Sequence, residues 1–274
     1  ASYRRQRQMC IRDSPNGLDG CGMGMVKASA PGKCILFGEH AVVYGEPALA
    51  CSINQRMTIE LEHEHMIEAW RLDGRKFNPK KHPHIEYIRN KLHSSTGNPL
   101  HIRIRGTIPK ASGLGSSAAL SVALCGALQQ LHNGSANKAQ ASLLAHHAEA
   151  AAQGGRASPM DTATSSYGGF IVLSDTIEEH LDFIETRTMD VDGSTRQWHL
   201  HTFEAAVPEG TALVVGNTGT HGSTSAMVNH VAELMRKNSS RKVELETIGA
   251  IARRGIQAFR EGDMEAVGQA MTEN

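Results

Sequence analysis

The chain has 274 residues, and its 28 Lys and Arg are balanced by 28 Asp and Glu, so the formal net charge is zero. A neutral chain has no overall field to attract nucleic acid or an anionic membrane, and no apolar run approaches the roughly 18 residues of a membrane span. We therefore expect no nucleic-acid partner and no membrane partner. Hydrophobic residues make up 40% and charged residues 20%, which is typical of a globular chain with a full core.

The cysteines indicate the redox environment. There are five, an odd number, and no two have CxxC spacing. This pattern argues against a disulfide framework or a zinc ribbon and is typical of proteins in a reducing compartment. We therefore expect a cytoplasmic location.

Residues 1–24 differ in composition from the rest of the chain. Arginines cluster before the first acidic residue, Asp13, and the segment has neither the apolar stretch of a secretory signal nor a periodic apolar face. We expect a disordered extension, or sequence upstream of a true start at Met25. A mitochondrial presequence is an alternative, because the segment is rich in arginine and poor in acids.

From Met25 onward the hydrophobic pattern predicts strands mixed with helices. The strand patterns cover residues 26–30, 34–37, 57–61, 100–105, 169–173 and a buried run at 211–215. The helical patterns cover the later part of 80–93, then 117–131, 139–153, 223–235 and 243–259, and Asp263 could cap one more. Residues 174–204 suggest a hairpin or a connector. Because strands and helices mix without regular βαβ alternation, we expect an α+β fold.

Residues 109–119 read Pro-Lys-Ala-Ser-Gly-Leu-Gly-Ser-Ser-Ala-Ala and connect an expected strand to an expected helix. Gly113 and Gly115 allow the backbone to approach a bound group closely, and Ser116 and Ser117 are good helix starters. The first-turn amides of a helix have no intrahelical partner and carry the positive end of the dipole. The segment therefore predicts a phosphate site. The alternative is an ordinary glycine turn into a capped helix.

Residues 30–45 place polar groups beside another expected strand. Lys33 follows a Pro-Gly turn and can present its ammonium to a phosphate, while Glu39 and His40 can converge on a ligand. The segment is not a P-loop, because Lys27 and Cys34 stand where that motif needs Gly and Ser or Thr. The alternative is a surface lysine followed by a solvated turn.

Two carboxylates follow later in the chain. Glu149 lies on an alanine-rich helical face, where a carboxylate is costly unless it meets a cation, so Glu149 and Ser117 form a plausible Mg²⁺ pair. Asp161 either caps a helix over residues 162–167 or accepts a hydroxyl proton during phosphoryl transfer. Residues 217–224 could bind a substrate anion at a helix start, or could be only a capped turn.

Three segments in this order resemble the GHMP kinase family of small-molecule kinases. They are residues 30–40, where Gly38 begins Gly-Glu-His-Ala-Val-Val-Tyr-Gly, residues 109–119 and residues 158–169. The resemblance implies a two-lobed fold. An N-terminal lobe like domain 2 of ribosomal protein S5 would span residues 25–205, and a ferredoxin-like lobe would span 206–274. The second lobe would be incomplete, because the family's third motif, a glycine run, is missing before Asn274.

The resemblance also implies a role for each site residue. Asp161 would accept the proton of the substrate hydroxyl, and Lys33 would stabilise the charge on the transferred phosphoryl group. Ser117 and Glu149 would hold Mg²⁺, the expected cofactor. The ATP-binding stretch would comprise Lys110, Ala111, Ser112, Gly113, Leu114, Gly115, Ser116, Ser117, Ala118 and Ala119. Glu39, His40 and Thr224 would face the substrate.

The same resemblance implies ATP as the phosphoryl donor and mevalonate as the acceptor. Phosphomevalonate and homoserine are alternative acceptors within the family, and a chain that binds nucleotide without turning it over is an alternative of another class. The loop at residues 153–157 has one glycine more than the family pattern, which leaves the Glu149–Asp161 register open. The resemblance is compatible with a homodimer, although no residue pattern indicates the oligomeric state.

Overall fold

The computed structural model describes residues 10–12, 25–63, 68–93, 98–109, 112–153, 157–191, 194–216 and 224–274. The chain divides into two compact units. The first holds the described residues up to Lys33 together with Ser52–Gly169, and the second holds Cys34–Cys51 with Phe170–Asn274. Each unit has its own cluster of buried apolar side chains.

The first unit is built on a mixed sheet, in which β4 and β6 are parallel and β3 and β6 are antiparallel. Its strands are β1 (Cys10–Arg12), β2 (Val26–Phe37, as far as Lys33), β3 (Ala48–His63, from Ser52), β4 (Arg71–Leu72), β5 (Arg75–Lys76) and β6 (Leu100–Gly106). They pair in the order β5-β4-β6-β3, with β2 pairing both β3 and β1. Ile59 and Leu61 of β3 lie opposite Ile104 and Ile102 of β6, so the alternating apolar residues of the two strands share one face.

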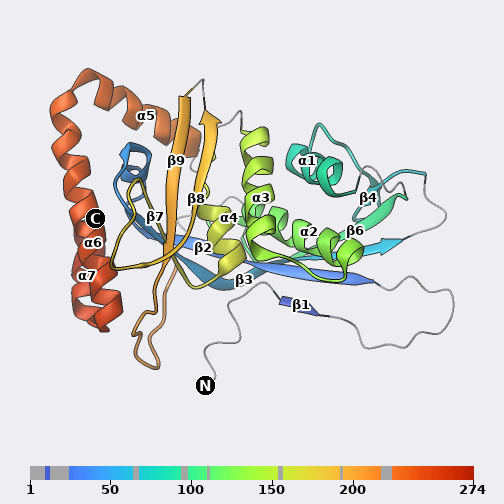
Figure 1. Ribbon diagram of the computed structural model, residues 1–274, viewed down its shortest axis with the longest axis horizontal. Coiled ribbons are helices and arrows are strands. Elements are labelled where there is room, and N and C mark those ends of the chain that lie inside the picture. Colours follow the sequence, from blue (N-terminus) through green and yellow to red (C-terminus); the bar gives the residue numbers. More distant parts are fainter. Residues whose placement is uncertain are drawn as a thin grey trace. The chain divides into compact units, whose positions relative to one another are not determined.

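Four helices complete the first unit: α1 (Pro83–Leu92), α2 (Ser116–Asn133), α3 (Lys138–Ala152) and α4 (Met160–Tyr167). Helices α1, α2 and α3 lie on one side of the strands and share a buried cluster with them (Figure 1). Helix α2 is buried on all sides from Ala118 to Gln129. Its small residues let α1, α3 and α4 pack directly against it.

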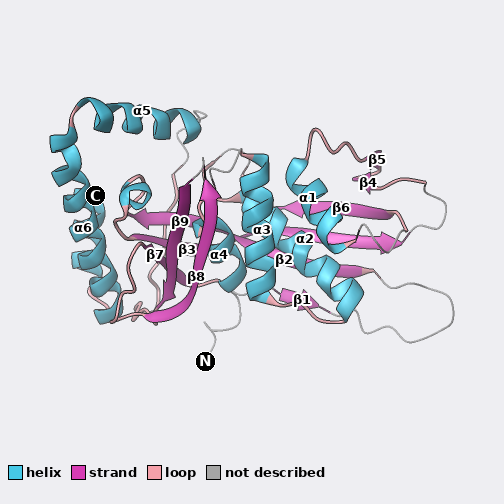
Figure 2. Ribbon diagram, turned by 45° about the horizontal axis from the view of Figure 1, so that its top comes forward, coloured by secondary structure: helices cyan, strands magenta, loops and turns pink. Residues whose placement is uncertain are grey.

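The second unit combines a β-hairpin with two packed helices. Strand β7 (Phe170–Ser174) pairs with the first residues of β3 and with β9 (Ser194–Thr202), which forms a hairpin with β8 (Asp182–Val191). The remaining elements are the 3-10 helices η2 (Ala41–Tyr44) and η3 (Ser239–Arg241), and the helices α5 (Thr224–Lys237), α6 (Lys242–Glu261) and α7 (Met264–Glu273). Helices α6 and α7 bury Ile256, Phe259 and Val267 against Phe37 and Val172. Figure 2 distinguishes these helices from the strands by colour.

The α+β class is confirmed, as are the helices and the hairpin expected within residues 174–204. Two strand predictions are wrong. Residues 26–30 and 34–37 belong to one strand, β2, which stays extended through Gly32. A Cβ at Gly32 would lie 2.7 Å from the Leu114 carbonyl oxygen, so glycine at this position permits close packing against the 112–115 loop rather than a turn.

The buried strand expected at residues 211–215 is also absent from the structure. These residues have no regular secondary structure, and Val214 is 88% exposed. An apolar run becomes a strand only where another strand accepts its backbone hydrogen bonds, and none of the described strands pairs with this segment.

Strand β1 lies inside the segment for which we expect disorder, and it pairs antiparallel with β2 through Cys10, Ile11 and Arg12. The rest of residues 1–24 lies outside the described residues. The lobe boundaries at residues 205 and 206 stay a prediction.

Candidate active site

Lys33 and the glycine loop are held together by backbone contacts within the first unit. The Lys33 N–H donates to the Leu114 carbonyl at 3.0 Å. Gly115 has a left-handed φ of 70°, and a Cβ there would lie 2.8 Å from Cγ of Lys33. Glycine is therefore required at residue 115 both for the backbone conformation and for the stem of the lysine.

The glycine loop leads into the N-terminus of α2. Helix α2 begins at Ser116, and its N-cap is Gly115, which has no side chain to accept from the first-turn amides. The first turn also carries no acidic residue. Its amides and the positive end of the helix dipole are thus available to an anion. Lys110 and Ala111 lie outside the described residues, and Ser112 Oγ donates to the Pro109 carbonyl.

Asp161 lies opposite Lys33. The Nζ atom of Lys33 is 3.0 Å from Oδ1 of Asp161, although the two residues are far apart in the sequence. The lysine side chain is buried at 8% exposure, whereas the aspartate side chain is 39% exposed. Asp161 lies in the first turn of α4, whose N-cap is Pro159, so the alternative in which Asp161 caps this helix is wrong. Its carboxylate remains accessible to a small molecule.

Glu149 is a buried carboxylate on α3. Its Oε1 accepts from Ser117 Oγ at 2.8 Å and from Ser121 Oγ at 2.9 Å, and its Oε2 accepts from Gln153 Nε2 at 3.4 Å. Burial raises the pKa of Glu149, the two serine hydroxyls lower it, and the nearby charge of Asp161 raises it. The structure therefore brings Glu149, Ser117 and Asp161 together despite the longer loop between the two acids.

Ser121 and Gln153 are two further site residues that the sequence did not predict. Ser121 lies four residues after Ser117, and this spacing on a helix places both hydroxyls on one face. Gln153 lies four residues after Glu149 in the same way. The i, i+4 spacing could therefore have indicated that each residue lies near a predicted site residue. It does not predict the hydrogen bonds to Glu149, because the bond from Ser121 also depends on how α2 packs against α3.

The donor set around Glu149 suits Mg²⁺. Across the described residues, no three His, Cys, Asp or Glu side chains converge to hold a metal by themselves. Mg²⁺ does not require such a cage, because it takes one or two carboxylates and completes its shell with phosphate oxygens and water. The three donors to Glu149 are neutral, so its burial is not offset by a cation among them. A buried carboxylate with only neutral donors, next to a serine hydroxyl, is a suitable pair of oxygen ligands for Mg²⁺.

The expected substrate residues belong to the second unit. Glu39 is exposed and His40 is half-buried, and both precede the 3-10 helix η2. Thr224 is the first residue of α5, but its side chain is outside the described part of the chain. Residues 217–223, for which we expect anion binding or a capped turn, also lie outside it.

Known proteins similar to this chain share both its sequence and its fold. The family model described as the GHMP kinases N terminal domain matches residues 83–169. A mevalonate kinase of Methanothermobacter thermautotrophicus is 33% identical over 252 residues, which is 90% of this chain and 75% of that protein. A mevalonate kinase of Pyrococcus abyssi is 30% identical over 74% of this chain and 60% of its own length.

A solved structure shares the fold. The crystal structure of L. major mevalonate kinase in complex with R-mevalonate has a TM-score of 0.66 and 23% identity, over 89% of this chain and 72% of that one. Among the described residues, no helix is both long and apolar enough to cross a membrane. The identity to the Methanothermobacter protein over three quarters of its length shows that the chain belongs to the GHMP kinase family, in its mevalonate kinase branch.

Proposed function

We propose that the chain transfers the γ-phosphoryl group of ATP to the 5-hydroxyl of mevalonate. The observation that supports this most is the Lys33–Asp161 pair beside the N-terminus of α2, whose own first turn contains no acidic residue. An accessible carboxylate, a buried cation and an anion site are the groups that phosphoryl transfer needs. The substrate follows from the relatives, which carry the name mevalonate kinase.

Asp161 is the proposed proton acceptor. The hydroxyl oxygen of the acceptor forms a bond to the γ-phosphorus as the bond between that phosphorus and the bridging β,γ-oxygen breaks, and ADP leaves. The hydroxyl proton passes to the Asp161 carboxylate, which is half-exposed and can meet the acceptor. The resulting carboxylic acid releases the proton to solvent after the product leaves.

Lys33 and α2 supply positive charge to the transferred group. The Lys33 ammonium is already fixed by its contact with Asp161 and by the Gly115 backbone packed against its stem. A fixed ammonium stabilises developing charge without reorganising during the reaction. The loop 112–115 and the first-turn amides of α2 would hold the phosphates of ATP.

Mg²⁺ would be held by Glu149 and Ser117. When bound, the ion neutralises phosphate charge and fixes the nucleotide. The protein's own part is to keep an ionised oxygen of Glu149 and the hydroxyl of Ser117 directed to one side of α2. Ser121 and Gln153 then orient the carboxylate.

Glu39, His40 and Thr224 are the proposed contacts to mevalonate, a role carried over from the family motif. The cytoplasm is the proposed location, on the basis of the odd cysteine count without CxxC spacing. The homodimer compatible with the resemblance remains a prediction for analytical ultracentrifugation.

An acceptor panel tests the function. ADP release is coupled to an optical readout with MgATP and, in turn, mevalonate, phosphomevalonate and homoserine, each run beside the Asp161→Asn variant. The proposal expects release that depends on mevalonate and is lost in the variant. Release that is equal with and without mevalonate, or that prefers homoserine, contradicts it.

A further inference from the structure

Two of the residues proposed to contact mevalonate, Glu39 and His40, lie on a short, tightly bonded segment of the second unit, which we name the acceptor turn (residues 38–46). The N–H groups of Val42, Val43 and Glu46 donate to the carbonyls of Gly38, His40 and Ala41 at 3.1, 3.1 and 3.2 Å. Gly38 has a φ of 77°, and a Cβ there would lie 2.2 Å from the Pro47 carbonyl oxygen. The turn is therefore internally rigid, and whatever holds its end also sets the direction of Glu39 and His40.

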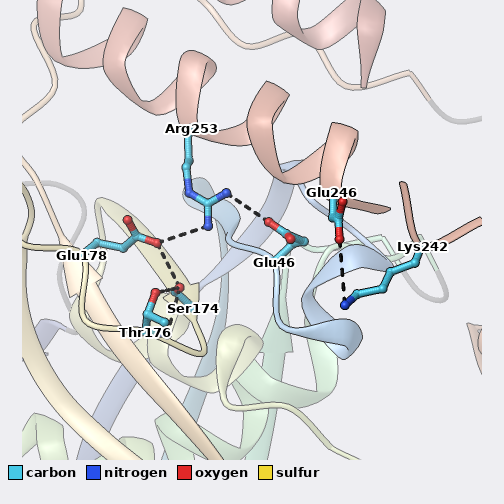
Figure 3. A network of polar contacts seen from close by, with 7 residues as sticks. All are labelled: Glu46, Ser174, Thr176, Glu178, Lys242, Glu246 and Arg253. Atoms are coloured by element: carbon cyan, nitrogen blue, oxygen red, sulfur yellow. Dashed lines mark hydrogen bonds and ion pairs between the residues drawn. The ribbon is translucent and has the colours of Figure 1, made fainter. Parts of the chain in front are cut away.

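The end of the acceptor turn is fastened to α6 by an arginine. Arg253 Nη1 lies 3.0 Å from Glu46 Oε2, and Arg253 Nη2 lies 3.8 Å from Glu178 Oε1 (Figure 3). Glu178 is itself fixed, because its Oε1 accepts from Ser174 Oγ at 3.0 Å and its N–H donates to His201 Nε2 at 3.1 Å. Arg253 thus bridges a carboxylate of the turn and a carboxylate that follows β7.

A glycine on α6 provides the space in which Glu46 lies. A Cβ at Gly249 would come within 1.8 Å of Glu46 Oε2, so any other residue must displace this carboxylate. Gly249 precedes Arg253 by four residues, a spacing that puts both on one face of the helix. Glycine is unfavourable within a helix. The close approach of the Glu46 carboxylate explains why residue 249 is nevertheless a glycine.

We propose that Arg253 is a positioning residue for the acceptor, which acts through Glu46 to hold Glu39 and His40 in their binding direction. The inference rests on the proposed function of that turn. The Arg253 side chain is 45% exposed, while those of Glu46 and Glu178 are 19% and 11% exposed. A half-exposed ion pair adds little to stability, but two largely buried carboxylates without their arginine would shift apart.

Because the groups proposed to bind ATP and the acceptor turn belong to different units, the proposal predicts that a change at Arg253 affects one substrate and not the other. Lys33, Asp161 and the glycine loop belong to the first unit, whereas Arg253 and the acceptor turn belong to the second. Removing the arginine should therefore weaken the binding of mevalonate and leave the binding of ATP alone. A purely structural role would change both, together with the melting temperature.

Steady-state kinetics of the full chain test this with a matched control. Arg253→Met should raise the KM for mevalonate by about fivefold, the loss expected from one exposed ion pair, with the KM for ATP unchanged. Arg253→Lys should restore part of the loss, because a lysine reaches only one of the two carboxylates. Arg260→Met is the control, since Arg260 lies on the same helix and donates to Gln257 within it at 3.0 Å.

Hydrogen exchange supplies a readout that does not require turnover. Exchange of the peptide covering residues 38–46 should accelerate in Arg253→Met and in Gly249→Ala, and not in Arg260→Met. Because alanine favours a helix more than glycine does, Gly249→Ala should keep or raise the melting temperature while it displaces Glu46.

The outcomes separate this inference from the proposed function. If the wild-type chain phosphorylates mevalonate and Arg253→Met behaves like Arg260→Met, the inference is overturned and the proposed function stands. Equal losses in both KM values with a lower melting temperature also overturn it. If the wild-type chain has no activity toward mevalonate, the proposed function fails, and unchanged exchange over residues 38–46 would then overturn the positioning role too.

Discussion

The buried ammonium of Lys33 lies 3.0 Å from the half-exposed carboxylate of Asp161. The lysine comes from the strand that packs on the glycine loop, and the aspartate comes from the first turn of α4. This combination gives a fixed cation together with a carboxylate that a substrate can reach.

Asp161→Asn should lower kcat by about 10²- to 10⁴-fold, because the amide keeps the shape of the carboxylate but cannot accept a proton. Nucleotide binding should be retained, since the glycine loop and α2 are unchanged. Turnover with mevalonate and titration with a fluorescent ATP analogue measure the two quantities. A fully active variant would remove Asp161 from the mechanism.

Glu149→Gln should raise the Mg²⁺ concentration needed for half-maximal activity by about tenfold or more, because the amide carries no charge for the ion. Ser117→Ala should act in the same direction but more weakly, since a hydroxyl is the weaker ligand. Mg²⁺ titrations at fixed ATP provide the measurement. An unchanged titration in Glu149→Gln would make Glu149 an ordinary buried helix residue.

The affinity for Mg²⁺ should depend on pH through the ionisation of Glu149. Burial raises the pKa of Glu149, and the ion requires the ionised form, so the affinity should rise as the pH increases through that raised pKa. Without metal, the free energy of unfolding should fall as the pH rises through the same range. The reason is that the folded chain retains the Glu149 proton to a higher pH than the unfolded chain does. Calorimetric Mg²⁺ titrations across pH in the wild type and Glu149→Gln test this, and identical profiles would contradict it.

Gly115→Ala should reduce activity far more than Gly134→Ala. Both glycines have left-handed φ values, 70° and 69°, and they flank the two ends of α2, so the backbone strain of the substitution is matched. A Cβ at Gly115 meets the Lys33 stem, whereas a Cβ at Gly134 meets nothing within 4 Å. The comparison of kcat at equal melting temperature isolates the displacement of Lys33, and equal kcat values would show that its position is not critical.

The stability of the chain should fall in mild acid because of His84. Burial lowers the pKa of His84 to about 4, with a smaller contribution from the charge of His82. A histidine whose folded pKa is depressed stabilises the protein above its unfolded pKa, and this stabilisation is lost as the pH falls from about 6.5 toward 4. His84→Leu should flatten the melting temperature over that window. The same acid-induced decline in the variant would assign it to other groups.

The sequence predicted much of this architecture, because its informative patterns are local. Helices such as α3 and α6 follow from periodicity, and the glycine loop, Lys33 and Asp161 follow from short motifs in family order. The pairing of Arg253 with Glu46 spans 207 positions and depends on how α6 packs, which no local pattern encodes. The error at residues 211–215 has the same origin, since a strand depends on its partner as much as on its own residues.

The most direct test of the central claim is ³¹P NMR of the wild-type chain incubated with MgATP and mevalonate. The account predicts that the γ-phosphate resonance of ATP is replaced by those of ADP and of a phosphomonoester that couples to the methylene protons at carbon 5. Asp161→Asn should form both products at least about a hundredfold more slowly. Release of inorganic phosphate alone, or a spectrum that stays that of ATP, would contradict it.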